Sequence, residues 1–197
     1  RQEEVTAPDG FTMRIESLGQ LHPSTNAEWE IRDHSPVSCV ACGQMTRLPV
    51  ILHWQLRLEG GRLRWEAALE CLREIQVKTI DFLLLLPTAY EQWSCGDTDG
   101  KFPEIRASDA VWNIVGGPWD LTVDPDAPSF DIAALPASGN SLPPVVVRVT
   151  PRNPYLGVYC ANTEYVLNSR LFLLHVRFPD REQNLAIGRH DLVSIEV

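Results

Sequence analysis

The sequence predicts a mainly β protein with one short helix, built as a β-sandwich or a jelly-roll-like barrel. Three observations lead to this expectation. Short segments rich in branched and aromatic residues recur at intervals of about ten residues, as they do in all-β domains. The 15 prolines and 12 glycines are spread along the chain, which favours many short elements joined by turns. A strongly patterned hairpin occupies residues 48–66.

The first part of the chain contains one strand and that hairpin. Residues 11–16 alternate apolar and polar side chains, which predicts a half-buried strand after a polar lead-in. Residues 17–36 are mixed in character and are expected to form a loop. Within the hairpin, apolar and polar residues alternate on both sides of Gly60-Gly61. Glycine supplies the positive φ of a tight turn, so the two alternating runs are expected to pair.

The pattern after the hairpin switches to helical spacing. Residues 66–76 are expected to form the one helix of the chain, with one apolar face made of Ala68, Leu72 and Ile75. Residues 77–87 return to strand character, and their run of leucines is too short to span a bilayer. Residues 94–103 are rich in Gly and Asp and are the best candidate for a linker.

The second part of the chain reads as strands separated by turns. Branched and aromatic residues, which fit a pleated surface, predict strands at 112–123, 130–135, 145–149, 171–178 and 187–197. Proline, glycine and aspartate predict a turn at 124–128 and a loop at 136–141.

Composition restricts the functional classes. The formal net charge is −9, which weighs against direct nucleic-acid binding, because neutralising phosphates needs a basic face. The five cysteines are an odd number and cannot all pair with one another. The first residues lack the apolar segment of a secretory signal. We therefore expect an intracellular, reduced protein that does not associate with membranes.

Four short segments in the last third of the chain follow one another in a characteristic order. They are Trp119-Asp120-Leu121, Pro151-Arg152-Asn153, Glu164-Tyr165 and the segment that begins at Gly188. In this order they resemble the motifs of the dUTPase family, most closely its herpesvirus branch. The resemblance implies that Asp120 lies near a metal–triphosphate site, that Arg152 faces phosphates and that Tyr165 belongs to a uracil-reading hairpin.

The same segments lack groups that dUTP hydrolysis needs. Asn153 stands where the family has a phosphate-binding serine, and Asn162 stands where it has the aspartate that activates water. An amide cannot act as that base, and losing a general base costs on the order of 10²–10⁴ in rate. Gly188 and the apolar strand after it are all that remains of a further motif. The resemblance therefore implies the fold of the family without its enzymatic activity.

The resemblance also suggests a domain organisation and a function. Herpesvirus dUTPases fuse two copies of the fold, so residues 1–100 are expected to be a degenerate first half and residues 110–197 a dUTPase-like β domain. The expected function is that of a non-enzymatic viral accessory protein, without a cofactor. It would bind a host protein in the nucleus or cytoplasm and modulate antiviral signalling or gene expression. Two alternatives stay open: a dUTP pyrophosphatase completed by a missing segment, and a structural capsid or tegument β-sandwich.

One metal-binding pattern competes with a simpler interpretation. Cys39 and Cys42 have the spacing of half a zinc site. The chain has no second Cys-x-x-Cys, so the site would need further ligands from His22, His34, His53 or Cys71. Ordinary strand or loop cysteines are the favoured interpretation, and we expect no bound metal.

Overall fold

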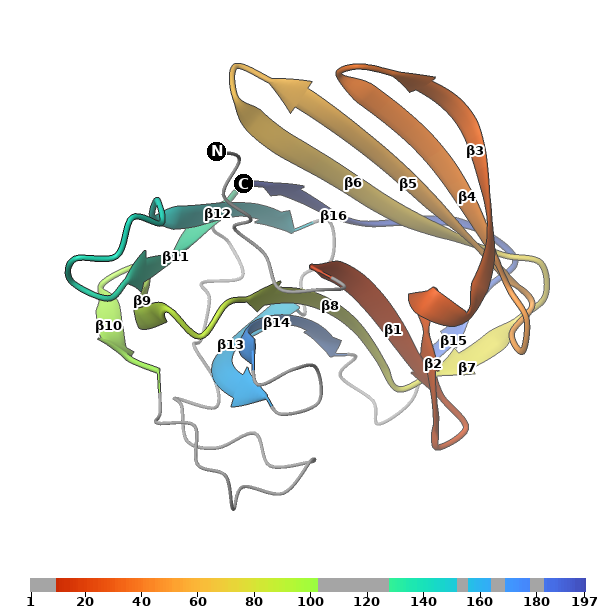
Figure 1. Ribbon diagram of the computed structural model, residues 1–197. Helices are drawn as coiled ribbons and strands as arrows, with labels where there is room; N and C mark the ends of the chain where they lie inside the picture. The colour runs from red at the N-terminus through yellow and green to blue at the C-terminus, as the bar shows by residue number, and fades with distance from the viewer. Residues whose placement is uncertain (1–9, 103–127, 152–155, 164–168, 178–182) are drawn as a thin grey trace.

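The computed structural model describes residues 10–102, 128–151, 156–163, 169–177 and 183–197 (Figure 1). These residues form two antiparallel sheets that face each other, so the expected mainly β, sandwich-like fold is confirmed. The smaller sheet has five strands in the order β13 (Leu156–Thr163), β14 (Ser169–Arg177), β8 (Thr79–Leu86), β1 (Phe11–Ser17) and β2 (Gln20–Pro23).

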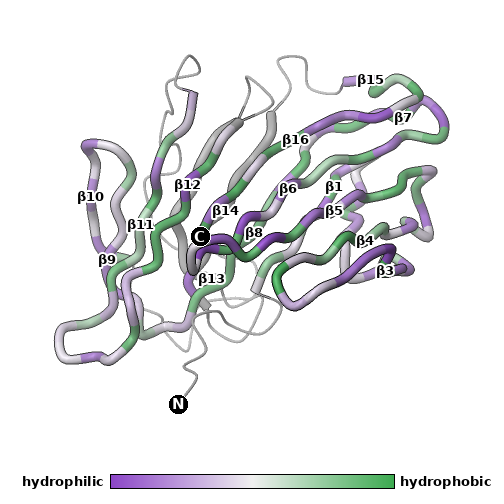
Figure 2. Tube along the Cα trace, turned by 90° about the horizontal axis from the view of Figure 1, so that it is seen from above, coloured by the Kyte–Doolittle hydropathy of each residue, from purple (hydrophilic) through white to green (hydrophobic). Residues whose placement is uncertain are grey.

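The larger sheet has nine strands. Their order is β10 (Thr98–Lys101), β9 (Tyr90–Cys95), β11 (Phe130–Pro136), β12 (Val145–Pro151), β16 (Gly188–Glu196), β6 (Arg62–Cys71), β5 (Val50–Glu59), β4 (Ser38–Met45) and β3 (Ala27–Ser35). A separate pair joins β15 (Gln183–Leu185) to β7 (Ile75–Val77). Hydrophobic and hydrophilic residues alternate along β5 and β6 (Figure 2), so one face of this sheet turns to the core and the other to solvent.

A row of aromatic side chains runs through the largely aliphatic core between the sheets. The ring of Trp65 on β6 lies at the centre, with ring centroids 5.4 Å from Phe11 and 5.6 Å from Phe82 on the facing sheet. The ring centroid of Trp54 on β5 is 4.9 Å from that of Trp65, and the ring centroid of Trp29 on β3 is 4.4 Å from that of Trp54. All of these pairs are edge-on or tilted, which is the favourable geometry for aromatic rings. The row therefore links the centre of the core to the outermost strand, β3.

The expected helix at residues 66–76 is absent, and this prediction was wrong. Residues 62–71 form β6, which pairs with β5 on one side and with β16 on the other. The buried residues Trp65, Ala67, Leu69 and Cys71 also recur with a period of two, so the segment fits a strand as well as a helix. The hairpin at Gly60-Gly61 decides between them, because it extends its register along the whole of β6. Among the described residues, the only helical element is a short 3-10 turn at Ser24–Asn26.

Two segments expected to be irregular are strands. The expected loop at 17–36 contains β2 and β3. The expected linker at 94–103 is the end of a hairpin, in which Gly96 adopts a φ of 57° between β9 and β10. The expected strands at 11–16, 77–87, 130–135, 145–149, 171–178 and 187–197 correspond to β1, β8, β11, β12, β14 and β16 and are confirmed. The expected strand at 112–123 lies outside the described residues.

Strands from both sides of the expected domain boundary share both large sheets. In the five-stranded sheet β8 pairs with β14, and in the nine-stranded sheet β6 pairs with β16. The boundary between residues 100 and 110 therefore does not separate one sheet from the other. No helix among the described residues is long and apolar enough to cross a membrane.

Candidate functional site

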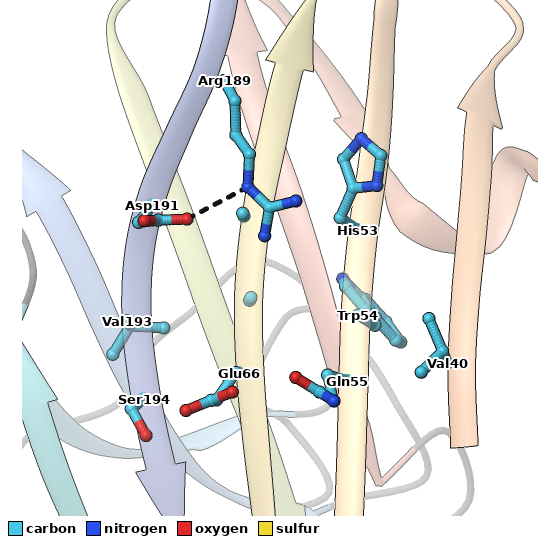
Figure 3. Close-up of a pocket in the computed structure, with 11 residues that line it drawn as sticks. Val40, His53, Trp54, Gln55, Glu66, Arg189, Asp191, Val193 and Ser194 are labelled. Atoms are coloured by element: carbon cyan, nitrogen blue, oxygen red, sulfur yellow. Dashed lines mark hydrogen bonds and ion pairs between the residues drawn. The ribbon is translucent and has the colours of Figure 1, made fainter. Parts of the chain in front are cut away.

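The solvent face of the nine-stranded sheet carries a groove of about 500 Å³ across β4, β5, β6 and β16 (Figure 3). The groove is deepest at Ala68, where a small side chain on β6 lies between the larger side chains of His53 on β5 and Asp191 on β16, which are its partners in register. A register shift between Asp191 and Val193 interrupts the pairing of β16 with β6 at the same place. Bulges of this kind redirect side chains and are common beside functional sites.

The polar groups of the groove come from both of its sides. The Arg189 Nε donates to Oδ1 of Asp191 at 3.2 Å. Figure 3 shows the guanidinium of Arg189 above β6, between Asp191 and His53. Glu66 forms an ion pair with Arg64 at 2.8 Å. The groove therefore offers hydrogen-bond donors and acceptors of both charges.

Three reactive side chains lie in a row on the same face. The Cys42 Sγ on β4 is 3.5 Å from Nδ1 of His53 on β5. The opposite ring nitrogen of His53, Nε2, lies 3.0 Å from Oε2 of Glu70 on β6. A thiol, an imidazole and a carboxylate thus follow one another across three neighbouring strands. His53 also lines the groove, so the row reaches its wall.

The core-facing side of the same sheet has a second unusual surface at its outer end. Trp29 is 37% exposed and Ile31 is 63% exposed, although the alternation along β3 turns both toward the interior. Val37 and Leu58, which are joined by a backbone hydrogen bond, continue this surface at 55% and 48% exposed. Figure 1 shows the ends of β3 to β6 extending beyond β1 and β8. We call the four residues Trp29, Ile31, Val37 and Leu58 the apolar overhang.

Trp29 is held firmly at the base of the overhang. Its Nε1 donates to the Ser24 carbonyl oxygen at 3.0 Å, and its ring contacts Trp54. The ring also lies against Gly43 on β4, where an added Cβ would come within 2.9 Å of it. A glycine is therefore needed at position 43 for this close approach. The overhang is a fixed surface that ends at the edge of the sheet.

The residues expected from the dUTPase resemblance are mostly outside the described residues. This applies to Asp120, Arg152, Asn153 and Tyr165. Asn162 lies in β13, opposite Arg170 of β14. Gly188 begins β16 with a φ of 123° and pairs with Cys71. Asn162 and Gly188 thus belong to different sheets, and the roles that the resemblance implies for them stay predictions.

The structure separates the two cysteines of the possible zinc half-site. Cys39 and Cys42 are three residues apart on β4, so their side chains point to opposite faces of the sheet. The described residues contain no group of three His, Cys, Asp or Glu side chains that could hold a metal ion. The partner of Cys42 is His53, one of the four possible further zinc ligands named above. No local sequence pattern favours His53 over the other three, and only the register of β4 with β5 places it opposite Cys42.

Comparisons with known proteins identify no family for this chain. No family model matches the sequence, and no curated protein matches it. One solved structure with a similar course of the chain is that of the Slr1438 protein from Synechocystis sp. PCC 6803. It shares 9% sequence identity at a TM-score of 0.42, over 98% of this chain and 74% of the other. A likeness at this level carries no argument about function.

Proposed function

We propose that this chain is a protein-interaction module that binds an extended segment of a partner protein as an added strand beside β3. The observation that carries the proposal is the exposed edge of the nine-stranded sheet. Among the described strands, β3 has a neighbour on one side only, and all of its residues after Ala27 are exposed. An edge strand offers a row of backbone donors and acceptors, which an extended peptide can pair with.

The apolar overhang supports this mode of binding. A strand added beside β3 would place every second side chain on the same face as Trp29 and Ile31. Apolar side chains at these positions would cover the overhang and remove it from water. Backbone hydrogen bonds would thus supply a general affinity, and the overhang would select apolar residues at alternate positions.

The charges on the other face of β3 indicate the chemistry of the partner. Glu28 and Glu30 lie on that face and are exposed. Arg32 pairs with Glu30 at 2.7 Å and sits where the register of β3 with β4 shifts. The regular part of the edge, from Ala27 to Ile31, is therefore acidic on its solvent side. It fits a segment in which basic residues alternate with apolar ones, because opposite charges on neighbouring strands stabilise a pair.

A second copy of this chain is a poorer occupant of the same edge. Two copies paired through β3 would bring like charges together, and each copy carries a formal net charge of −9. The resemblance to herpesvirus dUTPase-related proteins favours a host protein as the partner. In that setting the module would act in antiviral signalling or gene expression, in the host nucleus or cytoplasm.

The test is the binding of two matched synthetic peptides, measured by fluorescence anisotropy. One peptide alternates lysine with isoleucine or valine, and the other carries glutamate in place of every lysine. The proposal expects a dissociation constant on the order of micromolar for the basic peptide and binding at least about tenfold weaker for the acidic one. No binding of either peptide, or equal binding of both, would overturn it. Sedimentation of the free protein as a dimer would assign the edge to a second copy and would also refute the proposal.

A further inference from the structure

We propose that Cys42 is a nucleophilic thiol that accepts acyl groups from ester or thioester substrates, with His53 as its base and Glu70 as the residue that positions His53. The proposal does not depend on strand binding, since it concerns side chains of β4, β5 and β6 and not the free edge of β3. The carboxylate-bearing residue Glu30 of β3 lies in register with Cys42 on the same face. It rests on the row of three side chains and on the groove beside them. The sequence led us to expect a non-enzymatic protein because the dUTPase motifs are degenerate, and this proposal departs from that expectation.

The hydrogen bonds of the row define the state of the imidazole. A carboxylate can only accept hydrogen bonds, so the contact of Glu70 Oε2 at 3.0 Å places the ring hydrogen of neutral His53 on Nε2. The lone pair of Nδ1 then faces the Cys42 thiol at 3.5 Å. This is the arrangement in which a base takes the proton of a nucleophile while a third group orients the base. A carboxylate beside the ring also stabilises the imidazolium that results.

The groove supplies space for the substrate beside this row. Val40 lies on the same face of β4 as Cys42 and lines the groove, and His53 lines it from β5. The guanidinium of Arg189 lies across from His53 (Figure 3) and uses its Nε for Asp191. Its remaining N–H groups face the groove and can donate to polar groups of a substrate that lies there.

The step balances without any oxidant or reductant. The proton of the Cys42 thiol moves to Nδ1 of His53, and the thiolate attacks the carbonyl carbon of the ester or thioester. A new S–C bond forms, the bond to the leaving oxygen or sulfur breaks, and the leaving group takes the proton from His53. Water then attacks the acyl-Cys42 with His53 again as base, which releases a carboxylic acid and restores the thiol.

Cys39 is a matched internal control for the reactivity of the thiol. It lies on the same strand as Cys42 and is also partly buried, but it faces the opposite side of the sheet. Cys71 and Cys95 are further controls, because burial raises the pKa of both thiols.

The first experiment follows the alkylation of each cysteine by iodoacetamide at about pH 7 with peptide mass spectrometry. Each rate is divided by the rate of the same thiol in the urea-unfolded protein, which gives all thiols one reference. We expect Cys42 to react at least about tenfold faster than Cys39 on this scale. The His53→Gln substitution should lower Cys42 to the level of Cys39, and Glu70→Gln should lower the rate of Cys42 but not that of Cys39. Equal scaled rates in the unaltered protein, or no effect of His53→Gln, would overturn the proposal.

The second experiment tests acyl transfer with p-nitrophenyl acetate. We expect a burst of p-nitrophenol and an acetyl group on Cys42, both lost in Cys42→Ala and both kept in Cys39→Ala. Acetylation of Cys39 and Cys42 to the same extent, or a burst that persists in Cys42→Ala, would contradict the assignment.

Discussion

Replacing Ile31 by lysine should weaken peptide binding at the apolar overhang while it changes the stability of the fold only slightly. Because Ile31 is 63% exposed, the folded chain uses only the smaller part of the roughly 3 kcal/mol that full burial of an isoleucine provides. We therefore expect Ile31→Lys to lower the free energy of unfolding by about 1 kcal/mol at most. A partner strand that covers the exposed part would gain up to about 2 kcal/mol from the native side chain. The substitution should thus weaken binding of the basic peptide about 30-fold.

The assay is a pair of measurements on each variant, urea unfolding and peptide anisotropy. Ile187→Lys is the matched control, since Ile187 is 71% exposed and lies next to β16, four strands away from β3 in the same sheet. The control should lose little stability and no affinity. If Ile31→Lys binds the basic peptide as tightly as the unaltered protein, or if both variants lose affinity equally, the apolar overhang is not the binding surface.

Three further predictions concern the core, the pH dependence and the chemistry. Trp65→Ala should lower the free energy of unfolding, measured in urea, by about 3–5 kcal/mol. The control Leu72→Ala, at an exposed residue, should lower it by less than about 1 kcal/mol, and equal losses in the two variants would contradict the central place of Trp65 in the core. Burial, with a smaller contribution from Arg47, lowers the pKa of His22. As the pH drops below about 6.5, His22 is therefore protonated in the unfolded chain before it is protonated in the folded one, and the free energy of unfolding falls until the pH is below the lowered folded pKa. The His22→Gln substitution should abolish this fall in a denaturation series between about pH 7 and pH 5, and identical pH slopes for both proteins would contradict the prediction. Incubation with dUTP and Mg²⁺ should give no turnover above background, because the resemblance to dUTPases puts Asn162 where that family has its activating aspartate. Turnover at an enzyme-like rate would refute this expectation.

The sequence predicted the fold class because the strongest strands carry their own local signals. The hairpin at Gly60-Gly61 formed as expected, and Leu58 pairs with Leu63 across it. The helix at 66–76 was wrong because the segment contains two apolar patterns, one of helical spacing and one with a period of two. Only pairing with β5 and β16 decides between them. The turn residues before Ala27 predict a loop at 17–36, although Trp29 and Ile31 alternate with glutamates as in a strand. The structure shows that the alternation is the correct signal for β3.

The candidate sites could not be predicted from local patterns. His53 lies 11 residues after Cys42 and 17 before Glu70, and nothing but the register of β4, β5 and β6 brings the three together. The apolar overhang depends on where the smaller sheet ends, which no segment of the larger sheet encodes. Alternation alone could have shown that Cys39 and Cys42 face opposite sides of a strand, once that segment was recognised as one.

Amide hydrogen exchange with and without the saturating basic peptide is the most direct test of strand addition at β3. Backbone amides of an edge strand exchange readily on the side without a neighbour, and a paired strand protects them. Strand addition at β3 predicts new protection within Ala27–Ser35, strongest before Arg32, while β10 at the opposite edge of the sheet is unchanged. Protection at β10 or on the groove face, with β3 unaffected, would contradict strand addition at β3.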